Sequence, residues 1–438
     1  MAALLRRMRE NPRVTAYVCA VALLLPVLFV QRFAIPLRYV LPDHSGRATL
    51  SFRFLYLIPV ITGALSLVLA PETFRRVLRM RYALVGIACL MADVAVYAIA
   101  GVLERSFKAA LILPLTASAS VGALLTGIAV FKAAPAAIDL LVATATTASA
   151  AVGGFQMAEA LGYKTLVGSW IVHWDQAAAR MTGTTIAWRR AEGFALNPNV
   201  YTPFAVIGFA WVIFGRPKGF SRWLILASSS AIALLGQSRT TLAVILALLV
   251  IALLRIASDK FSHASNRRML LVLGITFVLL AAGVMAGRST DLRSSYPTRA
   301  LNATRTFLAD PVSDDSLTTR TIAWDTAVHA IAKNPWGWFQ RSASQMKPFK
   351  HPHNEFLFRL LYAGPLWLLV HLIFLVWLWA WLTPKSMRWI GAAIATIFLL
   401  NGIPEPIIWL HSYTVLLYVI VGCAMWAKAA ETTPATVA

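Results

Sequence analysis

The chain has 438 residues, of which 59% are hydrophobic and 13% are charged, and its mean hydropathy is +0.69. A water-soluble globular domain contains fewer apolar residues, so this composition excludes that class and indicates a membrane protein. The formal net charge of +22 favours anionic partners.

Apolar segments recur along the whole chain with the length that a membrane span requires. A helix needs roughly 20 apolar residues to cross a hydrocarbon core, although helices that are partly enclosed by neighbours can be shorter. Twelve segments meet this requirement: 14–31, 52–70, 83–103, 109–131, 136–155, 200–215, 222–237, 240–257, 269–287, 356–382, 388–402 and 410–428. The sequence therefore predicts an all-α polytopic membrane protein with about twelve transmembrane helices.

Basic residues divide the connections between these segments into two sets. Lys and Arg accumulate in short loops on the cytoplasmic side of a membrane. They are frequent at the N-terminus and in every second connection, at Arg6, Arg7, Arg9, Arg13, Arg75, Arg76, Arg79, Arg81, Lys132, Arg216, Lys218, Arg222, Arg255, Lys260, Arg267, Arg268, Lys385 and Arg388. This pattern predicts that both termini are cytoplasmic. No small-residue cleavage site follows the first apolar segment, so we expect an uncleaved span there.

Two long connections are too polar for the membrane, and both fall on the outer side. Residues 1–287 then hold spans one to nine, with an outer loop at 156–199. Residues 288–355 form a large outer loop, and residues 356–438 hold the last three spans and the tail. About half of the 40 Lys and Arg residues lie outside on this topology. Either an anionic ligand accounts for this outer charge, or long translocated loops escape the orientation rule.

The large outer loop ends in a helical pattern. Apolar residues recur at helical spacing at Ile322, Ala323, Ala327, Ala330 and Ile331. Asn334-Pro335 ends the pattern, so we expect an amphipathic helix on the outer face. Arg320 stands near the start of this helix, where the dipole favours anions. Its guanidinium is either solvated or holds a phosphate that the same helix end attracts.

The next segment, KPFKHPHNEFLFRLLYAG, is the most informative in the chain. Pro352 cannot lie inside a helix, so the tenth span is expected to begin just after it. His353 and Asn354 then lie in the first turn, at the membrane surface. Helical spacing places His353 on the face that holds Leu357, Leu360 and Gly364.

His353 has the setting of a general base. The positive end of a helix disfavours the protonated imidazole, and a neutral His can accept a proton near pH 7. One alternative is that His353 is an interfacial anchor or a hydrogen-bonding core group. Another is that His351, two residues earlier, is the relevant imidazole.

Further arginines mark the outer face. Arg239 lies at the tight outer turn between spans seven and eight, with Ser238 as the expected N-cap. A cation so close to hydrocarbon is costly unless it is paired, and we expect a diphosphate as its partner, with a distant Asp or Glu as the alternative. Trp188, Arg189 and Arg190 suit a lipid-phosphate headgroup, although arginines that only snorkel to the interface give the same pattern.

Other residues favour or exclude competing kinds of site. Asp93 and Asp139 lie inside apolar segments and are the main support for an ion-coupled transporter. Cys19, Cys89 and Cys423 also lie in apolar segments, where a thiol is usually a small buried hydrophobe. The chain contains no H-E-x-x-H motif, no Gly-rich phosphate loop and no dinucleotide fingerprint.

Together these motifs resemble the O-antigen ligase and polymerase superfamily of bacterial envelopes, and most closely its ligases. The matching residues are Gly193 with Asn197-Pro198-Asn199, Ser238-Arg239, Arg320 with Trp324 followed by Asn334-Pro335-x-Gly337, and His353-Asn354-x-x-Leu357 with Gly364. They cover about 188–365, and the first five spans resemble nothing beyond membrane helices. The family's ligases often have a leucine four residues after the equivalent of Arg239. Here that position is Ala243, with Leu242 one residue earlier.

The resemblance implies a glycosyltransferase that moves a polysaccharide from undecaprenyl diphosphate to a sugar of lipid A-core, with inversion at the anomeric carbon. It implies no metal and no cofactor. His353 and Arg239 are the expected catalytic residues. The expected substrate-binding residues are Arg320, Arg189, Arg190, Asn354 and His351. Expected partners are the lipid-linked donor, the lipid A-core acceptor and membrane lipid, without nucleic acid, and the expected location is the inner membrane with the active site facing the periplasm.

Three other functions remain open at this point. An O-antigen polymerase and a protein O-oligosaccharyltransferase belong to the same superfamily. A lipid-linked-sugar flippase or ion-coupled transporter also has many spans, but its critical charges are expected near the middle of the bilayer.

Overall fold

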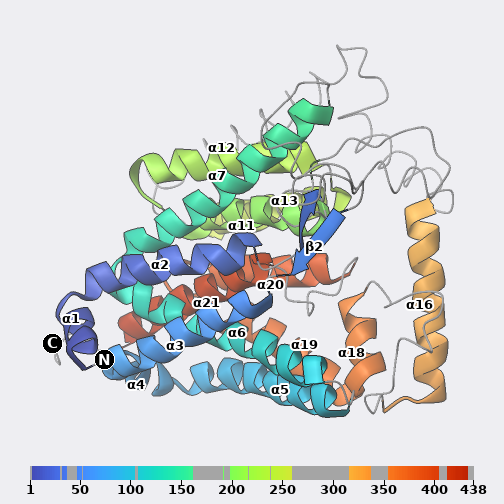
Figure 1. Cartoon of the computed structure of the whole chain (residues 1–438), viewed down its shortest axis with the longest axis horizontal. Coiled ribbons are helices and arrows are strands. Elements are labelled where there is room, and N and C mark those ends of the chain that lie inside the picture. The colour runs from blue at the N-terminus through green and yellow to red at the C-terminus, as the bar shows by residue number, and fades with distance from the viewer. Residues whose placement is uncertain are drawn as a thin grey trace.

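Long helices lying side by side form the body of the molecule (Figure 1). The structure, a computed structural model, describes residues 2–29, 32–36, 47–51, 53–103, 107–160, 191, 198–215, 217–236, 238–258, 315–336, 354–403 and 412–432. The helices of its first half are α1 (Ala2–Glu10), α2 (Pro12–Phe29), α3 (Leu57–Leu69), α4 (Pro71–Leu78), α5 (Arg81–Leu103), α6 (Phe107–Ala133) and α7 (Pro135–Ala160). Those of its second half are α10 (Pro198–Tyr201), α11 (Pro203–Ala210), α12 (Gly219–Gly236), α13 (Arg239–Ser258), α16 (Asp315–Lys333), α18 (Glu355–Ala363), α19 (Pro365–Trp381), α20 (Ile390–Gly402) and α21 (Ser412–Thr432).

Most of the predicted spans coincide with helices. Six described helices are long and apolar enough to cross a membrane, α3 and α4 together form a bent seventh candidate, and four shorter apolar helices match further predicted spans. The span predicted at 269–287 lies outside the described residues. Multiple membrane-spanning helices are therefore confirmed, whereas the number twelve stays a prediction.

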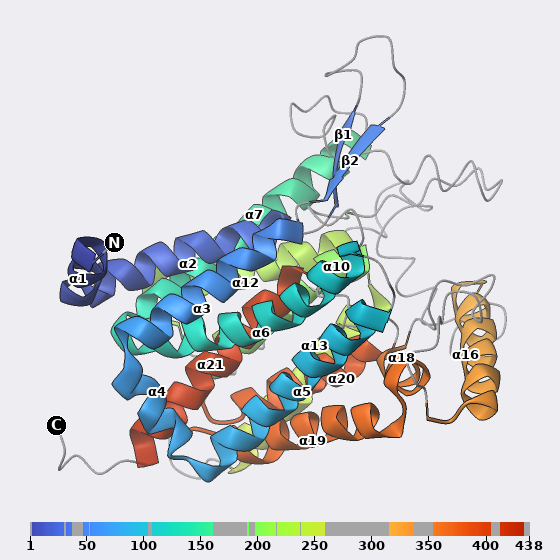
Figure 2. The same ribbon diagram turned by 60° about the horizontal axis from the view of Figure 1, so that its bottom comes forward.

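The bundle has two ends: basic connections lie at one, and the helices α16 and α18 lie at the other. Figures 1 and 2 show α1, α4 and the last turn of α21 at one end, which we call the terminal end. α16 and α18 lie at the other, which we call the α18 end. Hydrogen bonds join the terminal end: Arg9 donates to the Val68 carbonyl (3.3 Å), and Lys132 donates to Thr73 Oγ1 (2.8 Å). The N-terminus, the α3–α4 turn and the end of α6, which were predicted to share one side, thus lie together.

Small residues let the central helices approach closely. α6 packs against both α3 and α21. A Cβ on Gly127 of α6 would overlap the Val419 carbonyl, and a Cβ on Gly422 of α21 would overlap the Leu124 carbonyl. Such backbone contact between helices is common in membranes, where dispersion forces replace the hydrophobic effect between helices.

Three features depart from the all-α prediction of twelve simple spans. Strands β1 (Arg32–Pro36) and β2 (Arg47–Ser51) form an antiparallel pair, with Ala34 opposite Thr49. The segment predicted as one span at 356–382 is two helices, α18 and α19. The segment predicted at 200–215 is divided into α10, α11 and a π-helical turn, Trp211–Gly215.

Two residues explain the break in the predicted tenth span. Gly364 has a φ of 81°, a conformation that L side chains rarely adopt. Pro365 follows, and proline has no backbone N–H to continue the helical hydrogen bonds from the preceding turn. The sequence contains both residues, and the break was predictable from them.

α4 turns away from the span that precedes it. α3 and α4 meet at 93°, with the break at Ala70. Phe74 and Val77 of α4 are buried, whereas Arg75 and Arg79 are exposed. A short helix with one apolar and one basic face suits the membrane interface.

Candidate active site

α18 begins at a strong helix cap. Asn354 has extended backbone angles (φ −154°, ψ 124°), and its Oδ1 accepts hydrogen bonds from the backbone N–H groups of Phe356 and Leu357, both at 3.0 Å. These N–H groups have no partner inside the helix, so the cap satisfies them. The expectation that Asn354 lies in the first turn is therefore wrong, because the helix begins at Glu355.

This boundary also excludes His353 from the helical face on which it was predicted. The spacing that placed His353 on one face with Leu357, Leu360 and Gly364 assumed a continuous helix from 353 to 364. α18 starts two residues after His353 and ends at Ala363, directly before Gly364. The shared face is thus limited to residues inside α18, and His353 itself lies outside the described residues.

A buried ion network fixes α18 to the bundle. Arg359 donates from Nε to Glu355 Oε1 (2.6 Å) and from Nη1 to Asp93 Oδ1 of α5 (2.8 Å). The side chains of Glu355, Arg359 and Asp93 are 1%, 4% and 19% exposed. A buried guanidinium loses its hydration, and two carboxylates with direct hydrogen bonds compensate for that loss. The start of α18 is therefore tied to α5, far away in the sequence.

Aromatic rings enclose this network. Trp367 Nε1 of α19 donates to Asp93 Oδ1 at 2.6 Å, and the Arg359 guanidinium lies 4.7 Å from the centre of the Trp367 ring. Tyr97 packs edge-on against the same ring. Beside it lies a cavity of about 30 Å³, which Asp93, Glu355, Arg359 and His371 help to line. α18, α19 and α5 thus share one polar interior at the α18 end.

α16 and the turn after it pack on α18. Ala327 of α16 and Leu361 of α18 form a small buried cluster, with Ile331 and Leu357 at its edge. A Cβ on Gly364 would overlap the Trp336 carbonyl, so the turn after α16 lies directly against the end of α18. Two motifs predicted separately, around Asn334-Pro335 and at Gly364, are in contact.

The helix predicted before Asn334-Pro335 is confirmed as α16, with two corrections, whereas its place on the outer face stays a prediction. It begins at Asp315, so Arg320 lies in its second turn and not at the N-terminus. The helix dipole therefore attracts a phosphate at Arg320 only weakly, because its effect falls off within the first turn. Ile322 is 52% exposed and lies off the packed face, whereas Ala323 and Ala327 are buried.

The predicted Ser238-Arg239 motif stands at the start of α13. Arg239 is its first residue, and Ser238 Oγ accepts a long hydrogen bond from the Thr241 N–H (3.4 Å), which confirms Ser238 as the cap. The Ala191 N–H donates to the Leu235 carbonyl at 3.0 Å. The chain directly after Arg190 is therefore anchored at the end of α12, three positions before Ser238.

Several predicted side chains lie outside the described residues. They are those of His351, His353, Arg189, Arg190 and Arg239, although the backbone of Arg239 is described. Whether Arg239 and His353 approach each other stays a prediction.

The two intramembrane acids have partners in the fold. Asp93 binds Arg359 and Trp367, as described above. Asp139 of α7 accepts a hydrogen bond from Trp211 Nε1 at 2.9 Å. Both acids join neighbouring helices, so their support for an ion-coupled transporter is weaker than the sequence suggested.

The sequence prediction missed Arg359 and Glu355. Glu followed by Arg four residues later is a favourable helical pair, and a charge inside an apolar segment requires a partner. Both signals were present in EFLFR. The partner on α5 was not predictable from spacing, because 266 positions separate Asp93 and Arg359.

The helices and the buried network define a multi-pass membrane protein with a polar interior at the α18 end. A family model described as O-antigen ligase matches residues 223–372, a segment that includes Ser238-Arg239, α16 and α18. This match supports membership of the chain in the O-antigen ligase superfamily, whose members are membrane glycosyltransferase-like enzymes, and it confirms the resemblance. A search of curated proteins found no match.

Proposed function

We propose that this protein is an O-antigen ligase, which transfers a polysaccharide from undecaprenyl diphosphate to a sugar hydroxyl of lipid A-core. The observation that carries the proposal is the family match over 223–372, because this segment holds Arg239, Arg320 and His353 together. The family implies lipid-linked polysaccharide and lipid A-core as partners in general.

In the proposed reaction His353 is the general base. It takes the proton of the acceptor hydroxyl while the oxygen attacks the anomeric carbon of the donor. The bond from that carbon to the diphosphate breaks, and undecaprenyl diphosphate leaves with the electron pair. A single displacement of this kind inverts the anomeric carbon, and the broken diphosphate linkage supplies the driving force.

Cations stabilise the charge that develops on the leaving diphosphate. Arg239 stands first in α13, where backbone N–H groups and the guanidinium favour an anion together. Arg320, Arg189 and Arg190 are proposed as further contacts. The planar guanidinium binds phosphate oxygens through two parallel hydrogen bonds, which suits a metal-independent reaction.

The described contacts near His353 support a positioning role for α18. Asn354 caps the helix, and the Arg359 network holds that helix against α5, so the chain emerges from a fixed point. Because Oδ1 of Asn354 is engaged in the cap, a substrate contact from this residue falls to its amide nitrogen. His351 is proposed to lie near the acceptor.

The proposed orientation follows from charge. The terminal end carries the basic connections and is proposed to face the cytoplasm, with both termini. The α18 end then faces the periplasm, and the bacterial inner membrane is the proposed location.

A complementation experiment tests the function. In a strain lacking this gene, we expect lipid-linked O-antigen to accumulate beside bare lipid A-core, and wild-type protein to restore the joined product. Lipid A-core with single-repeat caps would instead indicate a polymerase. His353→Ala or Arg239→Ala is expected to lower transfer by about 10²-fold or more, the usual scale for a general base or a charge-stabilising contact.

His329→Ala is the matched control for His353→Ala. His329 is exposed on α16, and its ion-pair partner among the described residues is Asp325 of the same helix (3.4 Å). We expect this variant to keep wild-type transfer. Purified enzyme with lipid-linked donor and core acceptor should also stay active in a chelator, and a chelator-sensitive rate would contradict the metal-independent reaction. Loss of function in Asp139→Asn would favour an ion-coupled transporter.

A further inference from the structure

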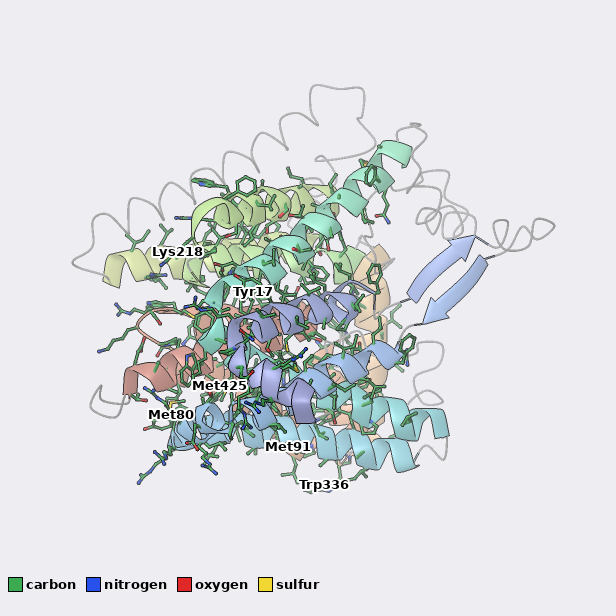
Figure 3. The ribbon with its side chains drawn as sticks, turned by 60° about the vertical axis from the view of Figure 1, so that its left-hand side comes forward. Tyr17, Met80, Met91, Lys218, Trp336 and Met425 are labelled. Carbon is green, nitrogen blue, oxygen red and sulfur yellow. The ribbon has the colours of Figure 1, made fainter. Side chains whose placement is uncertain are left out.

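A basic groove lies at the terminal end, far from the proposed active site. Its volume is about 550 Å³, and it opens between α4, the start of α5 and the ends of α19 and α21. Figure 3 labels Met80 and Met425, which line it from the α4–α5 turn and from α21. The charged residues in its lining are Glu72, Arg75, Arg76, Arg79, Arg81 and Lys428.

Three of these cations already bind groups of the protein. Arg75 pairs with Glu72 on α4 at 2.5 Å, which neutralises the one carboxylate in the lining. Arg76 donates to the Ala429 carbonyl at 3.2 Å, and its guanidinium lies against the Trp426 ring. Lys428 donates to a backbone carbonyl after α19 at 3.3 Å. These contacts hold α4 to the ends of α19 and α21 and shape the groove.

The two remaining cations stand on either side of the α4–α5 turn. Arg79 directly follows α4, Arg81 begins α5, and both are exposed. Neither guanidinium has a hydrogen-bond or ion-pair partner among the described residues. The two guanidinium groups are two residues apart, and Arg76 and Lys428 are held nearby. Such a group of cations attracts the oxygen atoms of a phosphate.

An aromatic and apolar wall adjoins these arginines. The ring of Tyr82 stacks on that of Trp381, with centroids 5.1 Å apart, and the Tyr82 carbonyl accepts a hydrogen bond from Trp377 Nε1 at 2.5 Å. Exposed apolar side chains continue along the outer faces of α5 and α19, at Leu84, Met91, Leu369, Ile373 and Val376. Tyr and Trp at the rim of a membrane protein sit at the headgroup level, above the acyl chains.

We propose that this groove binds an anionic glycerophospholipid, with its headgroup phosphate on Arg79 and Arg81 and its acyl chains along α5 and α19. The bend of 93° places α4 across the end of the bundle, where an amphipathic helix meets lipid headgroups. Basic pockets between membrane helices bind such headgroups. A zwitterionic lipid fits less well, because its ammonium would lie among cations and the carboxylate in the described lining, Glu72, is already paired with Arg75.

Native mass spectrometry of the purified full-length protein tests this proposal. The probes are phosphatidylglycerol, cardiolipin and phosphatidylethanolamine, each added at equal concentration. We expect the anionic lipids to be retained over phosphatidylethanolamine. Arg79→Gln with Arg81→Gln is expected to weaken their binding by about 30-fold, and Arg81→Gln alone by about fivefold.

The control removes the same charge at the same end of the molecule. Arg7 and Arg13 are exposed and do not line the groove. Arg7→Gln with Arg13→Gln is expected to leave lipid retention unchanged, and equal losses in both pairs would overturn the proposal by showing that net charge alone matters. Equal retention of all three lipids would overturn it too. Displacement of bound lipid by inorganic phosphate would show that the site recognises free phosphate instead. If the double variant does not fold, Arg81→Gln alone tests the role of the arginines in lipid binding.

Discussion

The two ends of the bundle handle charge in opposite ways. At the terminal end, Arg75 and Lys132 are exposed and bind an exposed carboxylate and a hydroxyl, and the half-buried Arg76 binds a carbonyl and a tryptophan ring. At the α18 end, Arg359 is buried with Glu355 and Asp93, within a shell of aromatic rings. Water and salt screen the first set but not the second. The comparison predicts that removing an exposed cation changes the stability of the fold little, whereas removing the buried cation of the α18 end destabilises it strongly.

The largest expected effect comes from breaking the buried network. Arg359→Leu leaves Glu355 and Asp93 buried without their cation, which typically costs about 3–5 kcal/mol of stability. We expect a large fall in the apparent midpoint of thermal unfolding in detergent, with loss of transfer activity. Scanning fluorimetry on the purified protein measures the midpoint.

Two further variants separate the buried charge from the lost packing of Arg359. Adding Asp93→Asn and Glu355→Gln to Arg359→Leu removes the orphaned charges and should recover part of the midpoint. Arg13→Gln removes an exposed cation and should not change it. An Arg359→Leu protein as stable as Arg13→Gln would show that the two ends do not differ.

The second effect concerns the turn that separates α18 from α19. Gly364→Ala places a Cβ against the Trp336 carbonyl at a φ of 81°, and strain of this kind costs about 1–3 kcal/mol. The expected result is a lower unfolding midpoint and weaker packing of α16, seen as faster hydrogen exchange in 315–336. Gly154→Ala is the control, because a Cβ there meets nothing within 4 Å. Equal midpoints for the two variants would show that the tight turn at Gly364 does not limit stability.

Much of the fold was predictable from the sequence, because hydrophobic length and proline or glycine positions are local properties. Spans, the helix at 315–333 and the Ser238 cap are of this kind. The start of α18 was misplaced by two residues, because the Asn354 side chain favours a cap over a first-turn position. The Asp93–Arg359 pair depends on how distant helices pack, which no spacing rule contains. The contact between the turn at Trp336 and Gly364 also depends on how distant helices pack, and it was not predictable from the sequence.

A smaller effect is expected at the cap of α18. Asn354→Ala removes the acceptor of two backbone hydrogen bonds and should cost about 1 kcal/mol. Asn354→Asp keeps the acceptor and should stay close to wild type in its unfolding midpoint. If Asn354 only positions the helix, transfer activity should follow stability in both variants. A large loss of activity in Asn354→Asp at unchanged stability would instead indicate that its amide nitrogen contacts substrate.

The smallest effect is expected at the exposed pair of the terminal end. Glu72 and Arg75 are 72% and 68% exposed, and pairs of this kind contribute about 0.5 kcal/mol or less. Glu72→Gln should therefore leave the unfolding midpoint unchanged while releasing Arg75 and removing the carboxylate from the groove. If the groove holds an anionic headgroup, this variant should bind phosphatidylglycerol more tightly than wild type, in the same native mass spectrometry measurement. Weaker binding would mean that Glu72 orders Arg75 for the lipid, and the terminal end would then depend on a fixed ion pair as the α18 end does.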